Sequence, residues 1–279
     1  MKIQCLYFSP TGNTRKIVEA VSKGTGYSHA KAIDLTLPQQ RESFTGSTAG
    51  DLLIVGVPVY SSTFPSIVLP SLKKLIGKSR YAVPVAVCGN CKFGNCLSEI
   101  TAILWKRGFT VVAAGNFIGQ QAFATEEYPL GWGRPDEADL KKAEDFGKRI
   151  AEKMRDNPEE IISTIGDPLS VYIQLYGGAK PEAEGLKAMP NRYRSMIFVE
   201  ANAKKRDECM GCERCVEVCP FGAIDPESLE IDDTSCLRCF ACVDACPKGL
   251  LVKHMAPVLD AHGFFKKQSS LRGEPLVFI

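Results

Sequence analysis

The stretch KIQCLYFSPTGNTRKIVEAVSK, residues 2–23, joins a mainly apolar run to a polar loop and then to an amphipathic segment. Residues 2–8 have the composition of a buried strand, and residues 9–14 are Ser, Pro, Thr, Gly, Asn and Thr. In residues 15–23 the apolar side chains fall on one face of a helix. A strand, a short loop and a helix in this order form the repeating unit of an α/β sheet.

The same alternation continues along the chain. Further strands are expected at 31–35, 51–57, 82–88 and 111–117. Further helices are expected at 66–76, at 96–106, and from a start within residues 133–137, with Pro135 near the first helical position, to about residue 154. The run DLLIVGV at 51–57 is continuously apolar, as in a strand that is covered on both faces. These five strands predict an α/β fold with a doubly wound, parallel, five-stranded sheet, whose ligands bind at the carboxyl ends of the strands.

The loop Ser9–Thr14 opens a helix and has the composition of an anion site. A helix N-terminus offers free N–H groups and the positive end of its dipole, and the hydroxyls add donors. The motifs of nucleoside triphosphate and dinucleotide sites are absent, and the loop contains no cationic side chain. Such a loop suits a phosphate monoester whose charge is met by dipoles. The alternative is a polar turn whose side chains only cap the helix.

The cysteines form a second pattern. Eight of the twelve Cys lie between Cys209 and Cys246, in the spacing C-x2-C-x2-C-x3-C-P, which occurs twice with an offset of 27 residues. Bacterial ferredoxins carry this run, and in them the fourth Cys ligates the neighbouring cluster. The resemblance implies two [4Fe-4S] clusters with interlocked ligands. Cluster A would be held by Cys209, Cys212, Cys215 and Cys246, and cluster B by Cys236, Cys239, Cys242 and Cys219. The alternative is zinc, which thiolates also bind.

The loops after residues 51–57 and 82–88 are expected at the same edge of the sheet as the phosphate loop, and they support a particular ligand for it. Ser9–Thr14 resembles the flavodoxin phosphate loop, [Ser/Thr]-x-Thr-Gly-Asn-Thr, which holds the phosphate of FMN. The loop after residues 82–88 resembles the family's Gly-Asn-x-x-Tyr-Gly stretch, with Phe93 in place of Tyr. The resemblance implies that FMN is held by Ser9, Thr11, Gly12, Asn13, Thr14, Pro58, Val59, Tyr60, Ser61, Gly89, Asn90, Phe93 and Gly94. The alternative for Tyr60 and Phe93 is a core or lid aromatic.

The order of these motifs resembles the flavodoxin–ferredoxin fusion proteins of anaerobes. The expected division is a flavodoxin-like domain at 1–156, a connecting segment at 157–206, a small α+β two-cluster ferredoxin-like domain at 207–253 and a C-terminal tail at 254–279. Asp167-Pro168 is expected to cap a short helix in the connecting segment. For the tail, folding back onto the body is favoured over docking on a partner.

Composition limits the function classes. The chain of 279 residues has a formal net charge of +2, which does not indicate a nucleic-acid or membrane binder. Its sequence contains no signal-peptide pattern and no apolar run long enough to span a bilayer, so we expect a cytoplasmic protein. Residues 207–253 contain ten Asp and Glu against four Lys and Arg, a net charge of −6, so the remainder carries +8. Either two domains attract each other or an acidic face meets a basic partner.

These features predict electron transfer between FMN and two [4Fe-4S] clusters, in a carrier that serves redox partner proteins. Two alternatives stay open: a flavin-dependent reductase of a small-molecule electron acceptor, fed by the clusters, and a redox-sensing regulatory protein. Homodimer formation is open too, as is whether the clusters serve the flavin of their own chain. Cys88, Cys91 and Cys96 are expected to be small buried or semi-buried thiols beside the flavin, with a redox-active Cys91–Cys96 pair as the alternative.

Overall fold

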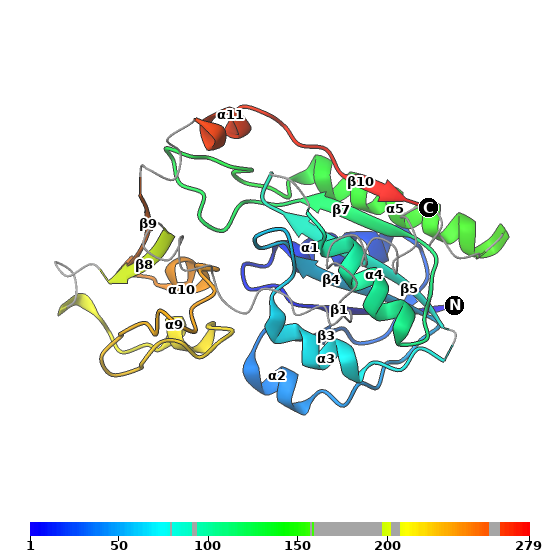
Figure 1. Cartoon of the computed structure of the whole chain (residues 1–279), viewed down its shortest axis with the longest axis horizontal. Helices are drawn as coiled ribbons and strands as arrows, with labels where there is room; N and C mark the ends of the chain where they lie inside the picture. The colour runs from blue at the N-terminus through cyan, green and yellow to red at the C-terminus, as the bar shows by residue number, and fades with distance from the viewer. Residues whose placement is uncertain (79, 91–93, 157, 159–196, 202–206, 257–262) are drawn as a thin grey trace, which may run out of the picture.

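The computed structural model shows two parts joined by several contacts, an α/β part and a smaller cysteine-rich part (Figure 1). It describes all residues except 79, 91–93, 157, 159–196, 202–206 and 257–262. The short helix expected after Asp167-Pro168 lies outside the described residues.

A single sheet organises the α/β part. Its strands are β1 (Lys2–Tyr7), β2 (Ser28–His29), β3 (Ile33–Asp34), β4 (Leu52–Pro58), β5 (Tyr81–Cys88), β6 (Thr110–Val111), β7 (Ala114–Ile118) and β10 (Leu276–Phe278). The order is β10-β7-β5-β4-β1-β2, with β3 beside β1 and β6 beside β5. All pairs are parallel except β10 with β7. The apolar runs of β4 and β5 occupy the middle, where both faces are covered.

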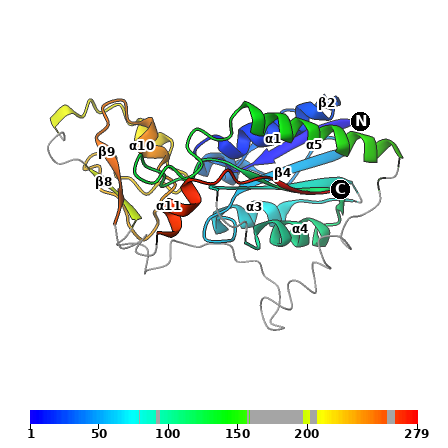
Figure 2. The same ribbon diagram turned by 90° about the horizontal axis from the view of Figure 1, so that it is seen from above.

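Helices cover both faces of this sheet. They are α1 (Asn13–Gly24), α2 (Pro38–Ser43), the 3-10 turn η1 (Ser66–Val68), α3 (Leu69–Lys74), α4 (Cys96–Lys106) and α5 (Glu137–Asp156). Figure 2 shows α1 and α5 on one face and α3 and α4 on the other. Each face has its own buried apolar cluster, so the predicted doubly wound α/β fold is confirmed.

Several elements differ from the prediction. The strand expected at 31–35 is only two residues long, and the strand expected at 111–117 is interrupted between β6 and β7. The segment expected to be helical at 66–76 begins as a 3-10 turn and ends at Lys74. Helix α2 was not predicted. It spans six residues, and its sequence PQQRES contains no apolar side chain that would reveal a helical period.

The C-terminal tail adds a strand that the prediction lacked. Helix α11 (Phe264–Ser269) leads to β10, which pairs antiparallel with β7 at the edge of the sheet (Figure 1). Val277 and Ile279 pack on the cluster under α1 and α5, and Phe278 packs on the opposite cluster. The tail thus folds back onto the α/β part and adds one antiparallel strand at the edge of the parallel sheet.

The cysteine-rich part is built from a repeated unit. It contains β8 (Ile197–Ala201), α9 (Arg214–Glu217), α10 (Ala241–Ala245) and β9 (Leu251–Met255), and β8 and β9 form an antiparallel pair. Backbone with positive φ recurs at the 27-residue offset, in Gly211 and Arg238, Glu213 and Phe240, and Gly222 and Gly249. The duplication in sequence is therefore also a duplication of backbone conformation. Strand β8 lies within the segment expected to be a connection. It was not predicted, because its partner β9 lies far along the chain, with Ala201 paired to Leu251.

Candidate functional site

The loop between β1 and α1 has the geometry of a helix N-terminus open to a ligand. Gly12 precedes α1 with φ of 83°, a conformation that glycine adopts without strain. Apart from its chain neighbours, no atom lies within 4 Å of where a Cβ on Gly12 would stand. The Ser9 hydroxyl accepts the N–H of Arg15 at 3.0 Å, so this side chain caps the helix. The N–H groups of Asn13 and Thr14 lie in the first turn of α1, where N–H groups have no partner within the helix, whereas later N–H groups bond within α1.

A cleft, which we call the flavodoxin-like cleft, lies where the carboxyl ends of β1, β4, β5 and β7 meet. Seven of its lining residues belong to the predicted flavin site: Thr11, Asn13, Thr14, Pro58, Val59, Tyr60 and Gly89. Three residues that were not predicted, Gln120, Gln121 and Ala122, follow β7 and also line the cleft. Their position after a predicted strand was the available signal, because the carboxyl ends of parallel strands share one edge.

Close backbone contact explains two glycines of this region. A Cβ on Gly89 would lie within 3 Å of Gln121, and a Cβ on Gly94 would overlap the backbone of Ser62. The N–H of Asn95 also bonds to the carbonyl of Ser62 at 2.7 Å. The loops after β4, β5 and β7 therefore pack directly on one another around the cleft.

The remaining predicted flavin residues take different positions. Ser9 is buried beneath the loop, where its N–H donates to Thr36 Oγ1 at 3.0 Å. Ser61 and Gly94 are exposed, and neither is among the described residues that line the cleft. Phe93 lies outside the described residues. Their roles toward a flavin remain predictions.

Asn90 holds the C-terminal tail. Its side-chain amide donates to the carbonyls of Gln268 (3.0 Å) and Leu271 (2.7 Å), and its oxygen accepts the N–H of Gly273 at 2.8 Å. The Arg134 guanidinium donates to the same oxygen at 3.3 Å. The side chain of Asn90, a predicted flavin residue, is thus hydrogen-bonded to the tail, while its backbone lies in the loop after β5.

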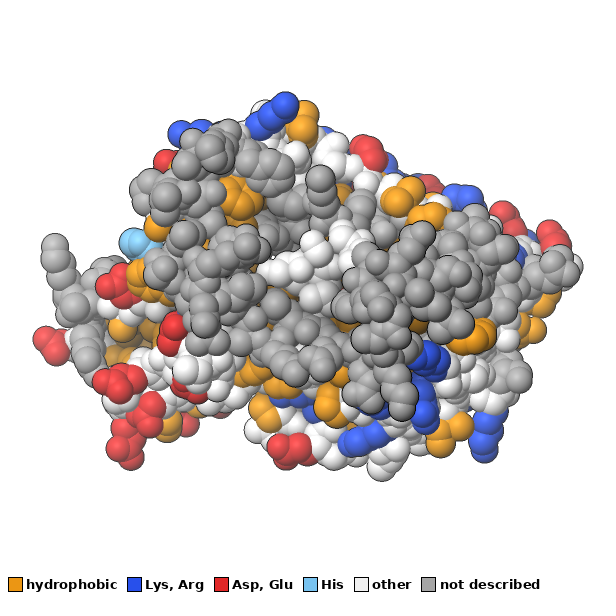
Figure 3. Space-filling view, in the orientation of Figure 1, with side chains coloured by type: hydrophobic (Ala, Val, Ile, Leu, Met, Phe, Trp, Pro, Cys, Tyr) orange, Lys and Arg blue, Asp and Glu red, His pale blue; other side chains and the backbone are white. Residues whose placement is uncertain are grey.

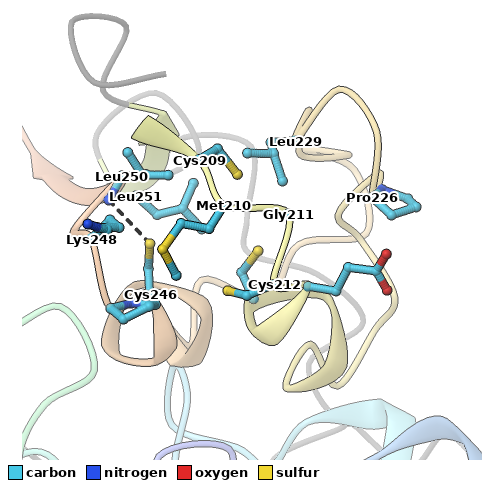
Figure 4. A pocket seen from close by; sticks show the side chains of 13 residues that line it. Cys209, Met210, Gly211, Cys212, Pro226, Leu229, Cys246, Lys248, Leu250 and Leu251 are labelled. Carbon is cyan, nitrogen blue, oxygen red and sulfur yellow. Dashed lines mark hydrogen bonds between the residues drawn. The ribbon is translucent and has the colours of Figure 1, made fainter. Parts of the chain in front are cut away.

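The eight cysteines of the repeat line two separate cavities, in the two sets predicted from the spacing. Cys209, Cys212, Cys215 and Cys246 line a cavity of about 490 Å³, which we call the outer thiol site. Cys219, Cys236, Cys239 and Cys242 line one of about 350 Å³, the inner thiol site. Figure 4 shows Cys209, Cys212 and Cys246 around the outer site. Among the described residues, no three Cys, His, Asp or Glu converge closely enough to hold a single metal ion.

Backbone N–H groups point at the sulfurs of both sites. The N–H of Ala223 bonds to Cys219 Sγ at 3.3 Å, and 27 residues later the N–H of Leu250 bonds to Cys246 Sγ at 3.3 Å. Burial acts to raise the pKa of Cys246, but these N–H groups outweigh it and lower the pKa. Such bonds stabilise a thiolate, which is the form that binds metal.

The inner site is the more buried of the two. Burial raises the pKa of Cys239 to about 12, so an uncompensated thiolate there is strongly disfavoured. In contrast, Cys209 and Cys212 of the outer site are exposed. A positive group such as a metal cluster would compensate the inner thiolates, and binding it would release protons.

The inner site packs against the flavodoxin-like cleft. Cys239 belongs to the same buried cluster as Tyr60, and Tyr60 also lines the cleft. Burial raises the pKa of Tyr60 well above its ordinary value, and the neighbouring Cys239 adds to this. The buried Arg41 donates to the carbonyl of Pro220 at 2.5 Å, directly after Cys219. A further apolar cluster joins Phe123 and Leu130 to Phe240.

Of Cys88, Cys91 and Cys96, the first and the last lie among the described residues. Cys88 and Cys96 are buried in the cluster beside the cleft, and burial raises the pKa of Cys96 well above its ordinary value. Cys91 lies outside the described residues, so the alternative of a Cys91–Cys96 pair stays a prediction.

Residues 208–251 match the family described as the 4Fe-4S dicluster domain. The strand order β3-β1-β4-β5-β7 corresponds to the flavodoxin-like order 2-1-3-4-5. The chain joins a flavodoxin-like domain to a 4Fe-4S dicluster domain. In the part that the structure describes, no helix is long and apolar enough to cross a membrane.

The flavodoxin-like domain is similar to several solved structures, whereas no curated protein sequence matches the chain. A flavodoxin from the domain Archaea shares 18% identity with a TM-score of 0.39, and the match covers 56% of this chain and 99% of that one. Flavodoxin 1 from Bacillus cereus shares 16% identity with a TM-score of 0.42, and the match covers 55% of this chain and 98% of that one. Rubredoxin oxygen:oxidoreductase from Desulfovibrio gigas shares 15% identity with a TM-score of 0.39, and the match covers 55% of this chain and 36% of that one. The strand order, and not these similarities, identifies the fold.

Proposed function

We propose that this chain is an electron carrier that binds FMN in its flavodoxin-like domain and two [4Fe-4S] clusters in its dicluster domain. The observation that carries the proposal is the order of the sites. The inner thiol site packs on Tyr60, Tyr60 lines the flavodoxin-like cleft, and the outer thiol site opens toward solvent. When bound, the flavin supplies two-electron chemistry and each cluster one-electron chemistry, while the protein sets their positions.

The thiol sites fit clusters by their donors. Each has four sulfurs that line one cavity and backbone N–H groups that bond to sulfur. Soft thiolates are the ligands that iron–sulfur clusters require. Outer-site residues Cys209, Cys212, Cys215 and Cys246 would hold cluster A. Inner-site residues Cys219, Cys236, Cys239 and Cys242 would hold cluster B.

The cleft fits a flavin phosphate at one end and a ring at the other. Thr11, Asn13 and Thr14 lie at the positive end of α1, where a phosphate is favoured. Tyr60 supplies an aromatic face on which an isoalloxazine ring would stack. The backbone amides of the loop after β5 would bond to the heteroatoms of that ring.

Contacts within the chain support electron transfer between the clusters and the flavin of the same chain. The Arg41–Pro220 hydrogen bond and the shared burial of Tyr60 and Cys239 fix the inner site beside the cleft of the same chain. A partner protein would then meet the outer site. Figure 3 shows Asp and Glu side chains gathered at the lower left, over the dicluster domain. We propose a redox partner with a basic face.

The decisive measurement is the cofactor content of anaerobically purified protein. We expect about eight iron atoms, matching sulfide and one FMN per chain, since each cluster holds four irons. Two zinc atoms without iron would contradict the cluster assignment. Iron without flavin would contradict the FMN assignment alone.

Turnover separates a carrier from a reductase. The reduced holoprotein is expected to pass electrons to a redox protein in a single turnover. It should also show no rapid multiple turnover of small acceptors when only a chemical reductant is present. Rapid turnover of such an acceptor would favour the reductase, and a partner that binds only one oxidation state without exchanging electrons would favour the sensor.

A further inference from the structure

A second cleft opens beside the phosphate loop, between the two domains. It is open to solvent and is lined by Thr11, Asn13, Gln120, Gln121, Ala122, Asp244 and Lys253. The first five of these residues also line the flavodoxin-like cleft. The two clefts therefore share a wall made by the phosphate loop and the Gln120–Ala122 loop, and the dicluster domain contributes Asp244 and Lys253 to the second cleft.

Lys253 is the only Lys or Arg among the described residues that line either cleft. The phosphate loop supplies no other cation to them. Arg15 Nε forms an ion pair with Glu19 Oε1 at 2.7 Å on the exposed side of α1, and Lys16 is exposed. A doubly charged phosphate at this loop therefore has one cationic side chain available, and it comes from the other domain.

The side chain of Lys253 is held in place rather than extended into solvent. It belongs to β9, where Lys253 pairs with Val199 of β8. Its ammonium lies 5.6 Å from the centre of the Phe240 ring and 3.3 Å from the Asp244 carboxylate. The Lys253 side chain is 15% exposed and that of Asp244 56%. The ammonium is thus partly desolvated beside an aromatic face, where an anion gains more from it than at an open surface.

We propose that Lys253 of the dicluster domain binds the phosphate of FMN, so that the second domain completes the flavin site. The inference rests on the proposed function, because it takes FMN as the ligand of the Thr11–Thr14 loop. Asp244 acts as the counter-ion of Lys253 and competes with the phosphate for it. The flavin then contacts both domains and stabilises their docking.

The test compares FMN with riboflavin, which lacks the phosphate. Affinities are measured by flavin fluorescence on the full chain, with its clusters and freed of flavin. We expect Lys253→Met to weaken FMN binding about tenfold or more, as for a lost charge-assisted bond, and to leave riboflavin binding unchanged. Lys253→Arg should restore most of the FMN affinity. Asp244→Asn should strengthen FMN binding, because the competing carboxylate is removed.

Lys267→Met provides the matched control, since Lys267 is exposed on α11 and is not among the described residues that line either cleft or either thiol site. It removes the same charge and should change neither affinity. An unchanged FMN affinity in Lys253→Met overturns the proposal, as does an equal loss for FMN and riboflavin. Wild-type protein that binds riboflavin as tightly as FMN also overturns it. If the wild type binds neither flavin, the proposed function itself fails.

Discussion

Asn90 combines a left-handed backbone conformation with a buried, hydrogen-bonded side chain. Its φ of 57° lies in the left-handed region, which Asn tolerates better than most residues. Its side chain, 4% exposed, is bonded to three residues of the C-terminal tail and to Arg134. A residue expected at a flavin loop therefore also fixes the segment that follows α11.

We predict that Asn90→Ala destabilises the protein by about 2–3 kcal/mol, from buried partners left unsatisfied and from strain at positive φ. The loss is measured by urea unfolding, and limited proteolysis should cut the tail near Arg272 faster. Asn90→Gly is the matched control, because it removes the amide and keeps the backbone conformation. Equal stability of Asn90→Ala and wild type would contradict the assigned role.

Tyr60 allows a second prediction at the residue scale. It lines the flavodoxin-like cleft and packs in the cluster that contains Cys239. Tyr60→Ala should weaken FMN binding by about tenfold through loss of aromatic contact, whereas Tyr60→Phe should keep most of the affinity. Flavin fluorescence measures both. A Phe variant as weak as the Ala variant would assign the effect to the hydroxyl instead.

At the scale of elements, the central strands and helices could be predicted from the sequence. β4 and β5 are continuous apolar runs, and α4 begins and ends at the expected residues, because local pattern and final burial agree there. β8 and β10 could not be predicted, since each pairs with a strand far along the chain. β10 contributes three residues, which is too short a run to show a period of two.

The pairing of β10 with β7 gives a prediction about the edge of the sheet. Val277 packs on the buried cluster under α1 and α5, whereas Leu276 is half exposed. Val277→Lys should release β10 and expose the edge of β7, which favours association between molecules. Hydrogen exchange at residues 114–118 and light scattering would both increase. Leu276→Lys is the control and should change neither, so an equal effect of the two variants would contradict the pairing.

A titration tests the ion pairs that hold the tail before β10. Arg272 bonds to Asp136 at 2.8 Å, and this bond, with a bond from the N–H of Asp139, holds the pKa of Asp136 well below its ordinary 3.8. Because the folded-state pKa is depressed, the pair stabilises the fold above the ordinary pKa and is lost as pH falls toward the folded value.

Arg272→Met should raise the pKa of Asp136 part of the way toward 3.8, since the backbone bond remains. The pKa is followed by NMR of the carboxyl carbon. Lys142→Met is the control, because Lys142 pairs with Glu274 of the same segment and not with Asp136. An unchanged Asp136 pKa in Arg272→Met would contradict the pair.

At the scale of the whole molecule, the cysteines line the two cavities in the groups that the repeat implies, but the sequence did not predict how the cavities and the cleft meet. The cysteine spacing assigned all eight thiols to their two cavities, because the repeat determines which loops face each other. Arg41, the Gln120–Ala122 loop and Lys253 were missed. Arg41 and Lys253 acquire their roles only through contact between the two domains, which no local pattern encodes. The Gln120–Ala122 loop could have been predicted from its position after a strand.

The separation of charge between the domains gives a last prediction. All ten Asp and Glu of residues 207–253 are exposed, and the outer thiol site lies among them. A partner with a basic face should therefore associate faster at low ionic strength, as salt screens the attraction over about 10 Å at 0.1 M. A basic c-type cytochrome serves as the probe, and stopped-flow measurement of its reduction by the anaerobic holoprotein gives the rate.

The double variant Glu208→Gln with Glu213→Gln should lower this rate several-fold at low salt and flatten its salt dependence, because both side chains flank cysteines of the outer site. Glu137→Gln with Glu152→Gln changes the net charge equally but lies on α5, and it should leave the rate near that of wild type. If both double variants slow the reaction equally, net charge alone governs the encounter. A local effect of Glu208 and Glu213 would instead place the partner at the outer thiol site, beyond the inner site and the cleft.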